Sequence, residues 1–100
     1  MPRVSLEVPH HLSPDEAVER LRQRAAAARS TFQNQISEFQ EEWTDHHAEF
    51  SIKVMGMKTT GTIAVATEKV NVNLELPFAA LLFRGAIEGR VRQELEELLR

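Results

Sequence analysis

Polar and apolar residues follow two different periods along the chain, and the first change of period marks the first element boundary. Residues 3–8 alternate polar and apolar, as in a half-buried strand. Pro9 and His10 open a turn, after which Ser13 is suited to cap a helix and Pro14 to begin it. A glutamate three residues after Ser13 completes a capping box. The sequence therefore predicts a strand that passes into a helix through a short turn.

A period of three to four residues then predicts one long helix from Pro14 to about Glu41. Polar and charged residues occupy the opposite face, which we expect to be solvated. The apolar stripe of this helix comprises Ala17, Val18, Leu21, Ala25, Ala28, Phe32, Ile36 and Phe39.

Strict alternation returns after this helix and predicts three strands joined by short turns, which form an antiparallel meander. The strands are expected at about Trp43–Met55, Thr59–Ala66 and Val70–Leu76, with Gly56 and Thr67–Lys69 in the turns. One face of this meander is apolar and the other is polar. The sheet is therefore expected to cover a core on one side only.

A second helix is predicted from about Phe78 to Leu99, because Pro77 ends the last strand. Gly85 and Gly89 lie four residues apart, and we expect them to allow close packing against the sheet or the first helix. The buried stripe comprises Leu82, Ile87, Val91, Leu95 and Leu98.

The predicted order β-α-β-β-β-α belongs to the α+β class. We expect a single two-layer domain over residues 1–100, with a four-stranded, mostly antiparallel sheet and two helices packed on one face. The alternation pattern leaves open which edge of the meander the first strand joins.

Composition excludes several classes of function. The chain has no cysteine, so disulfides, zinc–thiolate sites and cysteine nucleophiles are ruled out. A net charge of −3 at pH 7 gives no overall attraction to nucleic acid or to an anionic membrane. The sequence has no apolar run long enough for a membrane span and no pattern of a signal peptide. A cytoplasmic location is the default expectation.

Short motifs along nearly the whole chain resemble one known family. They are the Pro9–Ser13 turn, the region of Trp43, the Gly61–Ile63 strand, the Leu74–Phe78 junction and the closing Gly85–Leu99 segment. Together these resemble the polyhydroxyalkanoic acid system proteins, small bacterial proteins named after polyhydroxyalkanoate storage-granule gene regions. The resemblance implies a bacterial cytoplasmic protein that acts at or near polyester granules, with no assigned catalytic residues.

Four histidines form two adjacent pairs, His10–His11 and His46–His47, with Asp45 and Glu49 near the second pair. Imidazole and carboxylate groups suit zinc or iron. The spacing matches no helical metal motif, and adjacent residues of an extended segment point to opposite faces. We therefore predict no metal site and no cofactor, with His10 hydrogen-bonded in the turn that Pro9 opens and Ser13 closes. The chain also lacks a nucleophile elbow and a phosphate-binding loop, so we expect no enzymatic activity.

Large apolar residues are more numerous around the end of the last strand than one core can accommodate. A helix cannot direct all of the run from Phe78 to Phe83 into a single core. We therefore assign a candidate binding surface or interface to Met55, Met57, Phe78, Leu81, Leu82 and Phe83. The alternative is that these residues fill a wide core.

The leading hypothesis is a small non-enzymatic accessory protein that associates with granules or granule proteins, expected as a homodimer. The alternative is a carrier of an apolar or acyl ligand in a cavity between sheet and helices. A metal-dependent enzyme that uses the histidine pairs is the third hypothesis.

Overall fold

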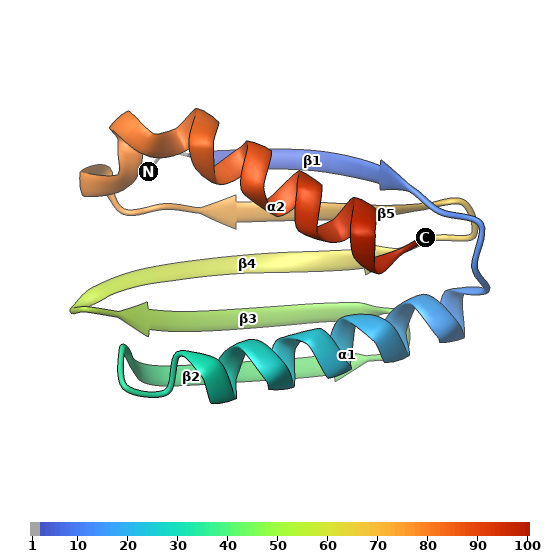
Figure 1. Ribbon diagram of the computed structural model, residues 1–100, viewed down its shortest axis with the longest axis horizontal. Helices are drawn as coiled ribbons and strands as arrows, with labels where there is room; N and C mark the ends of the chain where they lie inside the picture. The colour runs from blue at the N-terminus through green and yellow to red at the C-terminus, as the bar shows by residue number, and fades with distance from the viewer. Residues whose placement is uncertain (1–2) are drawn as a thin grey trace.

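The computed structural model describes residues 3–100 and forms one twisted sheet with two helices (Figure 1). The elements follow one another as β1 (Arg3–Pro9), α1 (Pro14–Thr31), β2 (Ile36–Thr44), β3 (His47–Val54), β4 (Met57–Val65), β5 (Lys69–Glu75), the 3-10 helix η1 (Phe78–Phe83) and α2 (Arg84–Leu98). The predicted α+β class, with two helices and an antiparallel sheet, is confirmed. The sheet has five strands rather than the predicted four.

The spatial order of the strands is β1-β5-β4-β3-β2, and every neighbouring pair is antiparallel. The first strand thus joins the last one, with Val4 opposite Leu74 and Val8 opposite Val70. β2 forms the other edge of the sheet. This register answers the question that the alternation pattern left open.

The predicted long helix is wrong after Thr31, where α1 ends. Ile36 and Phe39 continue the helical spacing, but they belong to β2, which pairs with β3. The hairpin turn between these strands places Asp45 at φ 57°, a left-handed conformation that aspartate tolerates. Helical propensity is a weak preference, and the backbone ladder of a β-hairpin outweighs it here, although the pairing shifts register between Ile36 and Glu38. The predicted strand Trp43–Met55 is therefore two strands, with Trp43 on β2 and its partner Ala48 on β3.

Both helices cover the same face of the sheet (Figure 1). The core lies mainly between α2, the first half of α1, and the strands β1 and β5. It consists of Val4, Leu6, Val8, Ala17, Leu21, Val65, Val70, Val72, Leu74, Leu76, Leu95 and Leu99. The other face carries residues such as Ser5, Thr62 and Asn73, as the alternation pattern predicted.

The prediction about the two helical glycines is wrong, because a β-carbon added at Gly85 or Gly89 would meet no atom within 4 Å. Close packing occurs instead at Gly61 on β4. A β-carbon there would lie 2.5 Å from Cζ of Phe50 and 2.6 Å from the backbone oxygen of Asn73. The phenyl ring of Phe50 thus lies over β4 at this point.

Candidate functional site

Exposed large apolar side chains gather at one end of the molecule, which we call the apolar end. They come from three segments: the residue after α1, the hairpin turn between β3 and β4, and η1. Figure 1 shows these segments together at the left end of the long axis. The residues concerned are Phe32, Met55, Met57, Phe78, Leu81, Leu82 and Phe83. Six of them are the candidate binding residues predicted from the sequence, and Phe32 is the addition.

η1 forms because Pro77 cannot continue the ladder of β5, and a short 3-10 turn follows with Ala80 N–H donating to the carbonyl of Pro77 at 2.9 Å. None of its six residues is buried. Ala80 packs against the core, whereas the side chain of Leu82 is 91% exposed. The 3-10 helix therefore holds a row of apolar side chains at the surface. The predicted second helix begins here as η1 and becomes α-helical only at Arg84.

The turn between β3 and β4 presents Met55 at its tip, 77% exposed. Met55 and Gly56 both have positive φ, 52° and 82°, as in the two-residue turns that suit a twisted hairpin. Glycine adopts this conformation freely, but methionine does so at a cost of about 1 kcal/mol or more. The strained backbone thus holds an apolar side chain out in water at the apolar end.

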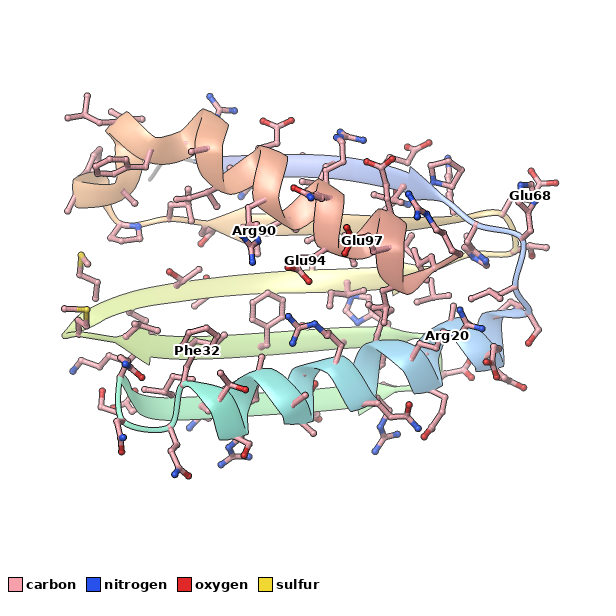
Figure 2. The ribbon with its side chains drawn as sticks, in the orientation of Figure 1. Arg20, Phe32, Glu68, Arg90, Glu94 and Glu97 are labelled. Atoms are coloured by element: carbon pink, nitrogen blue, oxygen red, sulfur yellow. The ribbon has the colours of Figure 1, made fainter. Side chains whose placement is uncertain are left out.

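Phe32 was predicted to lie in the buried stripe of a long helix, and that prediction is wrong. It caps the C-terminus of α1, and its side chain is 52% exposed. Figure 2 shows it at the same end of the molecule as the hairpin turn. The polar sequence Gln33–Gln35 that follows is the signal that could have marked the end of the helix.

Basic side chains border the apolar end on two sides. Lys53 and Lys58 lie directly opposite each other on β3 and β4, next to the Met55 turn. Arg84 follows Phe83 as the first residue of α2. None of these three forms an ion pair among residues 3–100. We call Lys53, Lys58 and Arg84 the basic rim.

The opposite end is closed by contacts between the two helices. Arg20 of α1 donates to the carbonyl oxygens of Leu98 at 3.1 Å and Arg100 at 2.6 Å, which the end of α2 leaves without helical partners. Figure 2 shows Arg20 at this end and Glu94 between the helices. Glu94 accepts from Arg24 at 3.2 Å, and this bond lowers the pKa of Glu94 below its ordinary value. The helices are thus tied together far from the apolar end.

The Pro9–Ser13 turn is a structural motif in which both ring nitrogens of His10 have partners. Leu12 N–H donates to Nδ1 at 3.1 Å, so Nε2 carries the hydrogen that it donates to the carbonyl of Ala66 at 2.9 Å. His10 is 3% exposed. The Ser13 hydroxyl accepts from Glu16 N–H at 3.1 Å and caps α1 as predicted. This histidine holds the turn against the β4–β5 connection.

The two histidine pairs approach the same end of β4, but they do not combine into one site. The backbone carbonyl of His46 accepts from Val65 N–H, while Nε2 of His46 lies 2.7 Å from Oδ1 of Asp15. Among residues 3–100, no group of three or more histidine, aspartate or glutamate side chains is arranged to hold a metal ion.

Two hollows lie outside the apolar end. One of about 750 Å³ crosses the open face of the sheet and is lined mostly by polar residues, among them Gln40, Ser51 and Asn73. A second of about 360 Å³ lies between the end of α1 and β2, where Phe39 is accompanied by Arg29 and Glu41. Neither helix of residues 3–100 has the length and apolarity to cross a membrane.

Comparison with known proteins identifies the family of the chain. A family model described as "Putative polyhydroxyalkanoic acid system protein" matches residues 4–99. The chain belongs to this family. The family resemblance predicted from the sequence motifs is thus confirmed over almost the entire length.

A solved structure with a similar fold is TTHA0849 from Thermus thermophilus. It has a TM-score of 0.59 and 14% sequence identity, and the match covers 98% of this chain and 92% of that chain. At this identity the likeness concerns the fold alone. No curated protein matches the chain.

Proposed function

We propose that this polyhydroxyalkanoic acid system protein is a non-enzymatic accessory protein that attaches to storage granules through its apolar end. The observation that carries the proposal is the gathering of every exposed large apolar side chain of residues 3–100 at one end. Membership of the family supports granules as the target.

The energetics favour adsorption to an apolar surface. Each large apolar side chain that leaves water contributes about 1.5–3 kcal/mol when it is fully buried. Leu82, Phe78 and Met55 are 91%, 72% and 77% exposed, so most of that free energy is available to a partner. Contacts at the opposite end, such as the bonds from Arg20 to the end of α2, do not involve these exposed side chains.

The experiment follows a fluorescent fusion of the full chain in granule-forming cells. Wild type is expected to colocalise with granules, and Leu82→Ser with Phe83→Ser is expected to become diffuse. Glu68→Ser, at the exposed turn between β4 and β5, is the matched control and is expected to behave as wild type. Because neither Leu82 nor Phe83 is buried, circular dichroism is expected to show a folded variant. A diffuse wild-type fusion in granule-filled cells would contradict the proposal.

A carrier of an apolar or acyl ligand is the second proposal, and the hollow between the end of α1 and β2 supports it. Phe39 supplies an apolar wall there and Arg29, whose guanidinium carbon lies 4.9 Å from the centre of that ring, supplies a cation for a carboxylate. Acyl-coenzyme A esters and hydroxy acids are then expected to raise the melting temperature by mass action. An unchanged melting temperature at millimolar ligand would count against this role.

A further inference from the structure

We infer that the surface bound by the apolar end is an anionic lipid layer, with the apolar side chains entering the acyl region and the basic rim contacting phosphate groups. The inference rests on the proposed function, because both assign binding to the apolar end. It adds the chemical nature of the surface that is bound, which apolar side chains alone do not specify.

The first support is the pairing of Lys53 with Lys58. Like charges placed directly opposite each other on neighbouring strands destabilise a sheet. Both lysines project from the open face beside the exposed Met55, and neither forms an ion pair among residues 3–100. A negatively charged partner would remove this repulsion, and long lysine stems can lie along an apolar surface while their ammonium groups reach a charged layer.

The second support comes from η1 and the start of α2, at the same end of the molecule. Arg84 directly follows the exposed Phe83, so a guanidinium group adjoins the apolar row of η1 as the two ammonium groups adjoin the hairpin turn. Alternation of this kind, with apolar side chains bordered by Lys and Arg, is typical of surfaces that lie in the interface of anionic lipids. Glu38 lies opposite Lys53 on β2 but forms no ion pair with it among residues 3–100, so the ammonium group of Lys53 stays available to a charged partner.

The third support is the distribution of acidic residues. Acidic side chains occur at the start of α1, in the β2–β3 turn, in the β4–β5 turn and at the end of α2, where Arg20, Lys69 and Arg100 also lie. Glu38 and Glu75 lie nearer the apolar end, and Glu75 is paired there with Arg3. Figure 2 shows Glu68 at the end far from Phe32. An anionic surface would repel that end and attract the basic rim, so it would orient the molecule with its apolar end first.

The test is cosedimentation of the full-length protein with lipid vesicles. One set is phosphatidylcholine alone, and the other contains about 30 mol% phosphatidylglycerol. We expect wild type to bind the anionic vesicles at least about tenfold more strongly, with the preference lost at high salt. Lys53→Gln with Lys58→Gln is expected to weaken binding to anionic vesicles about 20-fold. Lys69→Gln, which removes a lysine paired with Glu7 at 3.3 Å, is the matched control and is expected to have little effect.

Folding is not expected to confuse the result, because the double lysine variant removes a repulsive pair and should be at least as stable as wild type. If the double variant is unfolded, two other measurements test the inference: vesicle binding by Lys58→Gln alone and the salt dependence of wild-type binding. Equal binding to both vesicle types, or unchanged binding by the lysine variant, would overturn the inference. Binding to bare polyester particles without binding to either vesicle would overturn it as well, while leaving granule attachment through the apolar end intact. Failure to bind particles, vesicles and purified granules would overturn both.

Discussion

Nε2 of His46 lies 2.7 Å from Oδ1 of Asp15, so the turn between β2 and β3 is tied to the first turn of α1. Nδ1 of the same ring lies 3.3 Å from Oδ1 of Asp45. The hydrogen bond to Asp15 is the main cause that raises the pKa of His46 above its usual 6.5, and the charges of both carboxylates add to it. The imidazolium form therefore connects an edge hairpin to the helix that covers it.

This contact predicts a pH-dependent stability. A histidine whose pKa is raised by folding stabilises the protein fully below its unfolded pKa, and this contribution is lost as the pH rises through the folded pKa. We expect His46→Asn to lower the free energy of unfolding at about pH 5 and to change it little at about pH 9. Urea denaturation at both pH values measures this difference. His47→Asn is the control, since the exposed His47 takes no part in the contacts of His46 with Asp15 and Asp45, and its substitution should change the free energy of unfolding by less than about 0.5 kcal/mol.

His10 and His11 are adjacent but are expected to respond very differently to substitution. His10→Ala would leave the half-buried Leu12 N–H and the Ala66 carbonyl without their partner and would remove a buried ring, at a cost of about 1–3 kcal/mol in unfolding free energy. His11 is exposed, so His11→Ala should change this free energy by less than about 0.5 kcal/mol. Equal effects in denaturant melts would show that the His10 hydrogen bonds contribute no net stability.

Glycine substitutions are expected to have opposite signs at two positions. Gly61→Ala would place a β-carbon 2.6 Å from the backbone oxygen of Asn73, which cannot move without disturbing the β4–β5 ladder. We expect a loss of about 1–3 kcal/mol. Gly89→Ala meets no neighbour and improves helical propensity, so it should stabilise the protein by up to about 1 kcal/mol. Thermal unfolding of both variants gives the two signs directly.

The oligomeric state stays a prediction, and light scattering tests it. We expect wild type to be a homodimer in solution, because a second copy could cover the apolar end in the absence of a granule. Leu82→Glu would place a charge in that contact and should give a folded monomer, since Leu82 is 91% exposed in the single chain. A wild-type monomer would contradict the dimer and leave the apolar end free for another surface.

The α+β class, the Ser13 cap, the turn at Gly56 and the open-faced sheet could all be predicted from sequence. Each depends on neighbouring residues, through the period-two alternation of strands, the fixed spacing of a capping box, or the backbone preference of glycine. The candidate binding residues in the run from Phe78 to Phe83 also follow from local pattern, because one helical segment cannot bury six consecutive positions of mainly large side chains on one side.

Residues 32–41 could not be assigned correctly by the same reasoning. Phe32, Ile36 and Phe39 fit a helical stripe, and only pairing with β3 makes two of them strand residues. That pairing is a tertiary contact, and its backbone hydrogen bonds outweigh a propensity difference of a few tenths of a kcal/mol per residue. Close packing at glycine was expected at Gly85 and Gly89 but occurs at Gly61, for a related reason. Close approach depends on which atoms lie beside the glycine in the folded sheet, and not on the spacing of glycines along a helix.

The family, the class of fold and the surplus of apolar residues around Phe78–Phe83 could all be inferred from the chain alone, because each is a property of local pattern or of motifs along it. The three-dimensional arrangement alone shows that Phe32, the Met55 turn and η1 lie at the same end of the molecule, and that Lys53, Lys58 and Arg84 border it. These segments are far apart in sequence, and strand order together with the course of the helices brings them together. A surface consists of residues that are neighbours in space. Here the pairing of the five antiparallel strands determines which residues become neighbours.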